Sequence, residues 1–337
     1  MCTVFRHCSC AGDCVPLAST EEQGTVGAVG AFPTRRARPI EGSSGGSLGN
    51  VLSTGSEGER AAYVWSPWST QRRRRMVSAH TQEPLATPHS NELAGLKVLV
   101  TGASRGIGKA IALDMALHGA TVMCSSRDQS TLGLTVQEII ANGGVAESAM
   151  CDLSDPLSGR ALVQETIARL GDLDVVVNNA GLGGAPGDAL EEWLQVVAVN
   201  LTAPFVICET ASEHFKQKRS GKIINISSIL GVVADPGVPT PYVAAKHGLI
   251  GMSKNLAAKL APFGVQVNVV APGYVVTEMT KEDFEDERMH RSIVARTPLG
   301  RWGAESDITG IVTFLASDAA AFITGQTICV DGGWTCV

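Results

Sequence analysis

Tyr242 and Lys246 have the residue types and the spacing of a proton-transfer pair. They lie four positions apart in a run, residues 242–263, whose pattern predicts a helix, so their side chains should share one helical face. A free phenol has a pKa near ~10 and is a poor base at neutral pH. A close ammonium group would stabilise the phenolate and lower that pKa into the working range. Because this spacing also arises by chance on many helices, the pair needs support from elsewhere in the chain.

A hydroxyl that could assist the pair comes from Ser228, 14 residues before Tyr242. It lies at the end of a predicted strand, where it could hydrogen-bond the oxygen of a substrate while Tyr242 transfers the proton. Ser228 is favoured over the neighbouring Ser227 by its offset from Gly231. Together these side chains predict general acid and base chemistry at an oxygen atom.

A glycine-rich turn lies far upstream of this group. Residues 101–108 read Thr-Gly-Ala-Ser-Arg-Gly-Ile-Gly, between a predicted strand and a helical run at residues 109–117. Glycines let the backbone amides of such a turn approach a pyrophosphate, and the helix N-terminus adds a partial positive charge. Glycines also simply make turns, so the motif alone is a modest indication. We expect a nucleotide site here.

Short apolar strands alternate with longer helical patterns from about Leu93 to the end of the chain. This alternation is typical of βαβ units and predicts an α/β fold, a doubly wound parallel seven-stranded sheet with helices on both faces. No Pro/Gly/Ser-rich linker interrupts the pattern, so residues 91–337 are expected to form a single domain. The predicted strands are residues 98–100, 121–124, 146–150, 175–177, 223–226, 265–270 and 327–330.

Residues 1–90 have a different composition, rich in Gly, Ser, Thr, Pro and Arg and without Lys. Such a segment cannot bury enough apolar surface to offset its ordering entropy, so we expect disorder. An Arg- and Ser-rich leader is typical of an organelle transit peptide, although several acidic residues argue against it. Another kind of tail, or translation that begins at Met76, is the alternative. The early cysteines, residues 2, 8, 10 and 14, lack the paired spacing of a zinc site, so no metal is expected.

The overall composition excludes several classes of partner. The net charge is −6 and 18% of residues are charged, which does not suit a nucleic-acid-binding surface. No apolar stretch is expected to reach the ~18–20 residues that cross a membrane. Cys124, Cys151, Cys208 and Cys329 lie in or beside apolar segments, which indicates packed thiols and a reducing compartment. A small molecule is therefore the expected partner.

Taken together, the motifs resemble the short-chain dehydrogenase/reductase family. The turn at 101–108 matches its T-G-x-x-x-G-x-G fingerprint, and Asn178-Asn179-Ala180-Gly181, Asn200, Ser228, Tyr242-x-x-x-Lys246, Pro272-Gly273 and Thr277 follow in the expected order. The resemblance implies a Rossmann-like oxidoreductase that interconverts a ketone and a secondary alcohol with a nicotinamide cofactor. It also implies a catalytic tetrad of Asn200, Ser228, Tyr242 and Lys246.

Within that tetrad the resemblance gives each residue a role. Lys246 would bind the nicotinamide ribose as well as tune Tyr242, and Asn200 would hold a water that links Lys246 to solvent. The alternative for Asn200 is a helix-interior Asn that satisfies backbone groups. Two departures from the family are visible: Ser228 and Tyr242 are separated by one residue more than is common, and the stretch from Asn178 to Asn200 looks shorter.

The end of the second strand predicts which cofactor is bound. NAD-preferring relatives place Asp at the position of Ser126, whereas here Ser126 is followed by Arg127, and Arg105 could supply a second cation to a 2′-phosphate. NADP(H) is therefore favoured over NAD(H), although Asp128 could weaken that preference. The cofactor-binding residues implied by the resemblance are Gly102, Ser104, Arg105, Gly106, Ile107, Gly108, Ser126, Arg127, Asp152, Leu153, Asn178, Ala180, Gly181, Tyr242, Lys246, Pro272, Gly273, Val275 and Thr277.

Two substrate subgroups fit the resemblance. Residues 316–318 and 323–325 look like bacterial-type 3-oxoacyl-[acyl-carrier-protein] reductases, in which Arg219 would match a base that contacts the acidic carrier. Phe263, however, occupies the place of their second base. Residues 272–274, 277–280, 301–303 and 331–334 instead resemble sugar-acid dehydrogenases of the gluconate 5-dehydrogenase or 2-deoxygluconate 3-dehydrogenase kind. The reductase is slightly favoured because of Arg127.

Further expectations follow from the same resemblance. A non-catalytic NADP-binding protein is the alternative from another class, and the presence of the whole tetrad argues against it. Relatives are usually homotetramers or homodimers, so a homo-oligomer is expected. The location should be cytoplasmic, or a plastid or mitochondrion if residues 1–90 are a transit peptide.

Overall fold

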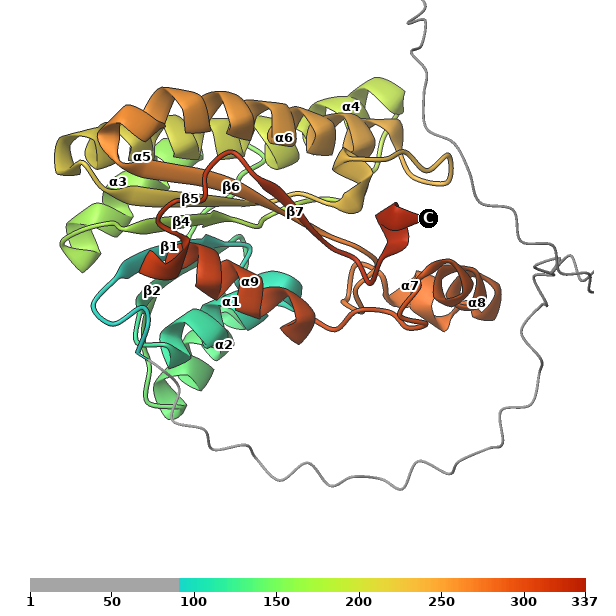
Figure 1. The fold of residues 1–337 in the computed structure, drawn as a ribbon, viewed down its shortest axis with the longest axis horizontal. Helices are drawn as coiled ribbons and strands as arrows, with labels where there is room; N and C mark the ends of the chain where they lie inside the picture. The colour runs from blue at the N-terminus through green and yellow to red at the C-terminus, as the bar shows by residue number, and fades with distance from the viewer. Residues whose placement is uncertain (1–90) are drawn as a thin grey trace, which may run out of the picture. The chain divides into compact units, whose positions relative to one another are not determined.

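Seven parallel strands form one sheet in the computed structural model, which describes residues 91–337 (Figure 1). The strand order is β3-β2-β1-β4-β5-β6-β7, so the order reverses between β1 and β4. In an open α/β sheet, this reversal opens a ligand crevice at the carboxyl ends of the strands. The strands are β1 (Lys97–Thr101), β2 (Thr121–Ser126), β3 (Val145–Met150), β4 (Val175–Asn178), β5 (Gly221–Ile226), β6 (Val265–Pro272) and β7 (Thr327–Val330).

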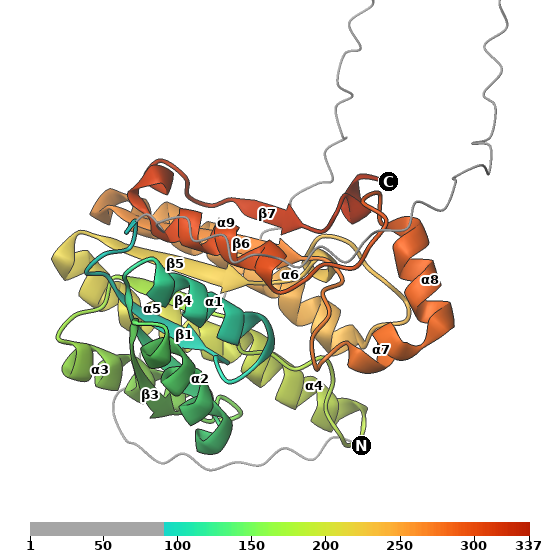
Figure 2. The ribbon, with the colours of Figure 1, turned by 90° about the horizontal axis from the view of Figure 1, so that it is seen from below.

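Helices cover both faces of the sheet, as predicted (Figures 1 and 2). The first, second and ninth lie on one face, and the third, fifth and sixth lie on the other. The seventh and eighth stand apart from these layers, near the C-terminus (Figure 2). The helices are α1 (Gly106–Leu117), α2 (Gln129–Ala141), α3 (Ser158–Leu170), α4 (Ala189–Val197), α5 (Ala203–Lys218), α6 (Thr240–Leu260), α7 (Lys281–Glu285), α8 (Glu287–Arg296) and α9 (Ser306–Ala316).

The central strands are largely apolar because both faces of the sheet are covered. In β1, Val98 and Val100 pack into the apolar cluster that includes α1 and α9. Leu99 points the other way and packs with residues of α3 and α5. The two sides of each strand therefore belong to different cores, which fixes the register of the sheet.

One helical stretch is longer and more apolar than the sequence analysis expected. Ala189–Lys218 runs continuously through α4, a π-helical turn and α5, and its mean hydropathy over an 18-residue window is 1.5. By length and composition it could cross a membrane, but Ile207, Ala211 and Phe215 of α5 are buried in the core beside β1 and β5. We interpret it as a core helix of the sheet fold.

The interpretations of residues 1–90 lie outside the described residues. These are the expected disorder, the transit peptide or start at Met76, the location that depends on them, and the early cysteines. They stay predictions.

The glycine at the start of β5 tests how tightly this core is packed. A Cβ at Gly221 would overlap the buried ring of Phe215, whereas a Cβ at Gly133 in α2 would meet no atom within 4 Å. We expect Gly221→Ala to destabilise the protein by about 1–3 kcal/mol because the ring cannot move without strain. Gly133→Ala should stabilise it by up to about 1 kcal/mol through helix propensity. Chemical unfolding of both variants checks this, and equal stabilities would contradict it.

Candidate active site

A cavity of about 500 Å³ lies at the carboxyl ends of the strands. It is lined by the turn after β1, the ends of β2 and β3, the segment after β4, and residues of α6 and of the β6–α7 connection. The cavity therefore coincides with the point where the strand order reverses. Of the predicted site residues, all but Asn178 and Asn200 line it.

The glycine-rich turn is shaped for close approach by a ligand. Gly102 and Gly106 have φ angles of 67° and 58°, which favour glycine. A Cβ at Gly108 would overlap the carbonyl oxygen of Gly102 and the amide of Asn179, so the turn can only close with glycine there. No side chain caps the N-terminus of α1, which begins at Gly106. Its first amides are thus free to bind an anion, which is the geometry that a pyrophosphate requires.

Thr101 joins this turn to the segment after β4. Its hydroxyl accepts hydrogen bonds from the backbone amides of Asn179 at 3.0 Å and Ala180 at 3.1 Å. The side chain of Asn179 in turn donates to the carbonyl of Thr101 at 2.9 Å. Two walls of the cavity are therefore held together by one buried threonine.

Asn178 does not line the cavity, contrary to the sequence-based expectation. Its amide nitrogen donates to Asn225 Oδ1 at 2.9 Å and to Cys208 Sγ at 3.3 Å, so it links β4 to β5 and α5. Successive strand residues face opposite sides, and Asn178 faces the core that contains Cys208. Asn179, which the sequence analysis did not select, lines the cavity instead.

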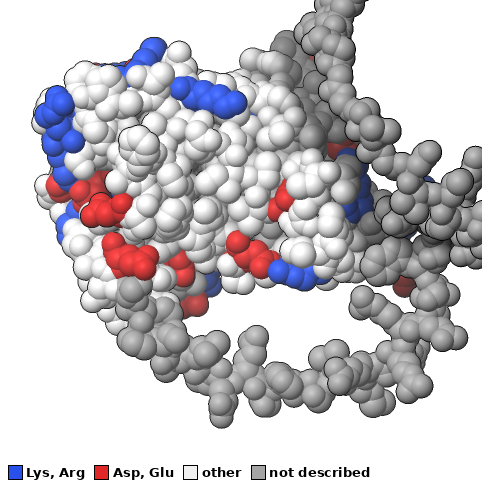
Figure 3. Space-filling model, viewed as in Figure 1, with Lys and Arg blue, Asp and Glu red and all other residues white. Residues whose placement is uncertain are grey.

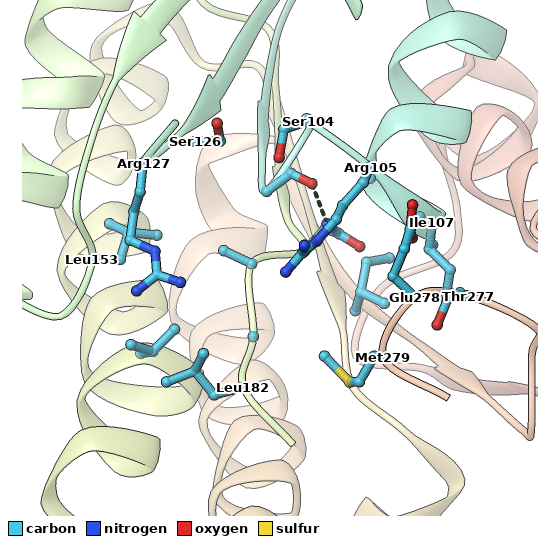
Figure 4. A pocket seen from close by; sticks show the side chains of 18 of the residues that line it. Ser104, Arg105, Ile107, Ser126, Arg127, Leu153, Leu182, Thr277, Glu278 and Met279 are labelled. Atoms are coloured by element: carbon cyan, nitrogen blue, oxygen red, sulfur yellow. Dashed lines mark hydrogen bonds between the residues drawn. The ribbon is translucent and has the colours of Figure 1, made fainter. Parts of the chain in front are cut away.

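The end of β2 presents a cation to the cavity. Arg127 reaches in from this side and Arg105 from the glycine-rich turn (Figure 4). Asp128 is exposed beside them, but its carboxylate accepts hydrogen bonds from the Ser130 amide at 2.9 Å and hydroxyl at 2.7 Å. These bonds lower the pKa of Asp128, and its carboxylate caps the N-terminus of α2. Asp128 therefore stays ionised at neutral pH, with its carboxylate hydrogen-bonded at the start of α2.

Asp152 and Leu153 border the same end of the cavity. Asp152 also accepts a hydrogen bond from the Ser154 amide at 2.9 Å, and this bond, aided by the charge of Arg127, lowers the pKa of Asp152. Asp152 is therefore both a turn residue and part of the cavity wall.

Ser228, Tyr242 and Lys246 meet at the other end of the cavity. Ser228 is close enough to Tyr242 to lower the pKa of its phenol, and Ser228 Oγ accepts from the Leu230 amide at 3.1 Å. Lys246 Nζ donates to the carbonyl of Ile226 at 2.9 Å and lies 5.6 Å from the centre of the Tyr242 ring. The extra residue between Ser228 and Tyr242 has not separated them.

The pKa values at this end differ from the sequence-based expectation. Burial raises the pKa of Tyr242, and the nearby Ser228 offsets only part of that effect. Burial also lowers the pKa of Lys246 to about 8. The lysine was expected to lower the pKa of the phenol, but loss of hydration around the hydroxyl is the larger effect.

Asn200 is buried and secures the wall of the cavity. Its amide nitrogen donates to the carbonyl of Leu182 and its Oδ1 accepts from the Leu182 amide, both at 2.8 Å. The π-helical turn Ala198–Thr202, a feature often found at functional sites, places it there. The side chain thus satisfies backbone groups, which was its alternative interpretation. A role through a bound water stays a prediction.

The wall beside Ser228 and Tyr242 is partly apolar. Leu182, Val199 and Met279 line it, and Met279 Sδ lies 3.6 Å from the position of a Cβ at Gly183. Thr280 holds this part of the β6–α7 connection, because its hydroxyl donates to the carbonyl of Val275 at 2.6 Å. The sequence analysis selected none of these side chains as site residues, although Met279 lies in the stretch 277–280 that resembles sugar-acid dehydrogenases.

The family model described as "Enoyl-(Acyl carrier protein) reductase" matches residues 102–335. A 3-oxoacyl-[acyl-carrier-protein] reductase, FabG, from Escherichia coli K12 is 40% identical over 245 residues, 71% of this chain and 97% of that protein. The chain belongs to the short-chain dehydrogenase/reductase family. Another 3-oxoacyl-[acyl-carrier-protein] reductase, from Synechocystis, is 42% identical over 240 residues, 70% of this chain and 95% of that protein.

Solved structures of the same family include sugar-acid dehydrogenases. A putative gluconate 5-dehydrogenase from Beutenbergia cavernae, with bound NADP, is 39% identical with a TM-score of 0.69 and covers 74% of this chain and 100% of that one. A gluconate 5-dehydrogenase from Burkholderia cenocepacia, in complex with NADP and tartrate, is 34% identical with a TM-score of 0.70 and covers 74% and 98%. The chain is thus an oxidoreductase similar to both predicted subgroups.

No metal site accompanies the cavity in the described part of the chain. Within residues 91–337 no group of three or more His, Cys, Asp or Glu side chains is placed to hold a metal ion.

Asn200 offers a test of how the cavity wall is held. We expect Asn200→Ala to destabilise the protein by about 1–3 kcal/mol, because the amide and carbonyl of Leu182 lose their partners. Hydrogen exchange should accelerate at residues 181–183. Asn255→Ala, at an exposed position of α6, is the matched control and should change neither measurement. Unchanged stability and exchange in Asn200→Ala would show that these bonds do not hold the wall.

Proposed function

We propose that this chain is an NADP(H)-dependent oxidoreductase in which Tyr242 transfers the proton between a substrate oxygen and the protein. The observation that carries the proposal is that Ser228, Tyr242 and Lys246 share one cavity with a glycine-rich turn and an uncapped helix N-terminus. A non-catalytic NADP-binding protein would not need three polar side chains at the end of the cavity away from that turn.

The residues of the cavity fit a dinucleotide that carries a 2′-phosphate. Glycines at 102, 106 and 108 leave room for the pyrophosphate, and Arg105 and Arg127 supply cations. Charge-assisted hydrogen bonds from guanidinium groups to phosphate are among the stronger ones. Asp128, which could repel the phosphate, is engaged at the start of α2. When bound, the cofactor supplies or accepts a hydride.

The raised pKa of Tyr242 favours the direction of reduction. Burial keeps the phenol protonated at neutral pH, so Tyr242 can donate a hydrogen bond, and then its proton, to a carbonyl oxygen. The hydroxyl of Ser228 gives a second hydrogen bond to the same oxygen. With a pKa of about 8, Lys246 is mostly charged at pH 7 and stabilises the phenolate that remains.

The apolar wall supports a 3-oxoacyl thioester as substrate. Leu182, Val199 and Met279 can pack against an acyl chain. The cations of the cavity do not lie at this wall. Arg105 and Arg127 serve the nucleotide end, and Lys246 is bound to Ile226. A polyhydroxy carboxylate would need a charge-assisted partner that this end of the cavity does not provide.

The motifs that favoured sugar acids have structural partners of their own. Arg301 forms a two-bond ion pair with Asp307, at 2.6 and 2.9 Å. The carboxylate of Asp331 accepts from the Gly333 and Thr335 amides, both at 2.9 Å. A sugar-acid dehydrogenase stays the second candidate because two solved relatives have that name and hold NADP.

The surface at the end of α5 supports an acidic carrier of the thioester. Arg219 is exposed and donates to the carbonyl of Pro262 at 3.0 Å. Phe263 occupies the place of the second base of the reductases. Lys216 Nζ lies 6.0 Å from the centre of the Phe263 ring and supplies a cation near that place. In the view of Figure 3, Lys and Arg side chains gather towards the upper left and most Asp and Glu side chains lie below them. We include docking of an acidic carrier in the proposal.

Exposed apolar side chains support assembly into a homodimer or homotetramer. Leu190 and Leu194 of α4 are 64% and 59% exposed, and Phe205 of α5 is 46% exposed. Such side chains on neighbouring helices would be covered by a second copy of the chain.

The decisive experiment is NADPH oxidation with an acetoacetyl thioester, 5-ketogluconate and simple diketones, using wild type and Tyr242→Phe. We expect the thioester to react fastest and Tyr242→Phe to lose about 10²–10⁴-fold in kcat, because the proton donor is gone. Tyr274→Phe is the matched control, since its hydroxyl lies 3.4 Å from Asp235 and outside the cavity. Wild-type turnover in Tyr242→Phe would exclude the mechanism, and preference for 5-ketogluconate would favour the second candidate.

Arg127→Ala tests the choice of cofactor. We expect the KM for NADPH to rise about 10–100-fold, as one charged hydrogen bond of about 1.5–3 kcal/mol is lost, with little change for NADH. Arg291→Ala, on exposed α8, should change neither value. An equal rise for both cofactors would place Arg127 elsewhere than at the 2′-phosphate.

A further inference from the structure

An acidic side chain lies beside the glycine-rich turn. Glu278 lines the cavity from the β6–α7 connection, and its Oε2 lies 3.8 Å from the position of a Cβ at Gly106. Gly106 is the first residue of α1, whose N-terminus no side chain caps. Figure 4 shows the side chain of Glu278 directed towards this start of α1. A carboxylate therefore lies close to the amides that are free to bind an anion.

The backbone on both sides of Glu278 is hydrogen-bonded. Before it, the Val276 amide donates to the carbonyl of Gly303 at 3.0 Å. After it, the Thr280 amide donates to the carbonyl of Thr277 at 3.2 Å, and the Thr280 hydroxyl donates to the Thr277 carbonyl at 3.4 Å. The fold therefore fixes where the Glu278 side chain leaves the backbone, at the edge of the cavity.

The charge of Glu278 has no cationic partner in the described part of the chain. Its side chain is exposed, and within residues 91–337 no hydrogen bond or salt bridge engages its carboxylate. Lys109, in the first turn of α1, is paired with Glu138 at 2.8 Å. The nearest other charge is a second carboxylate, since burial and the charge of Glu278 both raise the pKa of Glu305. An incoming anion would therefore meet the full charge of Glu278.

The same amides attract both the carboxylate and a pyrophosphate. The partial positive charge of a helix N-terminus stabilises a nearby carboxylate, and it also stabilises a bound phosphate group. A phosphate that binds at the start of α1 must overcome the repulsion of Glu278, or must displace its side chain and lose the attraction that held it there. Because Glu278 is exposed, its side chain is free to turn away into solvent. In either case the phosphate binds more weakly than it would beside an uncharged residue.

We propose that Glu278 competes with the cofactor pyrophosphate for the start of α1 and thereby lowers the affinity of this chain for dinucleotides. The inference rests on the proposed function, since it needs a dinucleotide in this cavity. It gives Glu278 a task different from that of Arg127, which distinguishes NADP(H) from NAD(H), because both cofactors carry the pyrophosphate. A weaker hold on the pyrophosphate favours release of the cofactor after the reaction, and product release limits the turnover of many enzymes.

Glu278→Gln removes the charge and keeps the size of the side chain. Isothermal titration calorimetry of the full chain measures binding of NADP⁺, NAD⁺ and adenosine 2′-monophosphate. We expect the Kd values for NADP⁺ and NAD⁺ to fall by the same factor, about 3–10-fold. The Kd for adenosine 2′-monophosphate, which lacks the pyrophosphate, should not change. At about 1 M salt, where charges are screened beyond about 3 Å, the gain should shrink to less than about 2-fold.

Glu282→Gln is the matched control, because it removes the same charge from an exposed position of α7 outside the cavity. It should leave all three Kd values unchanged. Dinucleotide binding that is unchanged or weaker in Glu278→Gln overturns the inference, and so does an equal gain in Glu282→Gln or for adenosine 2′-monophosphate. In these cases the wild type still binds the dinucleotides and the proposed function stands. If the wild type binds neither dinucleotide, the proposed function fails and the inference fails with it.

Discussion

The hydroxyl of Thr101 links the two walls of the crevice just beyond the paired residues of β1 and β4. The crevice exists because β1 and β4 are neighbours whose connections leave in opposite directions, and such an opening needs a tie between its walls. Thr101 supplies that tie by accepting the backbone amides of Asn179 and Ala180. The glycine-rich turn on one side and the wall after β4 on the other keep their spacing through this buried contact.

A second chain of buried hydrogen bonds connects β4 to α6, the helix that carries Tyr242 and Lys246. Asn178 donates to Asn225 at 2.9 Å, and Asn225 donates to Ser253 Oγ at 2.8 Å. Ser253 donates to the carbonyl of Leu249, so the chain ends inside α6. These bonds link β4, β5 and α6 to one another.

Burial then decides the electrostatics of the pair on α6. A lysine beside a tyrosine in water would favour the phenolate, but here both groups have lost solvent. Each is driven towards its neutral form, which raises the pKa of Tyr242 and lowers that of Lys246 to about 8. Tyr242 is thereby kept as a proton donor at neutral pH, with a charged lysine still available below about pH 8.

The sequence alone determined the parallel sheet, its strands and the family, because buried strands need continuous apolar runs and a phosphate turn needs glycines at fixed positions. It also selected most of the residues that line the cavity. Only the tertiary structure decided that Asn179 and not Asn178 lines the cavity, and that Asn200 binds the backbone of Leu182. The apolar wall of Leu182 and Met279 likewise depends on loops. Such contacts join segments far apart in the chain or depend on which way one side chain points, and neither leaves a periodic signal in the sequence.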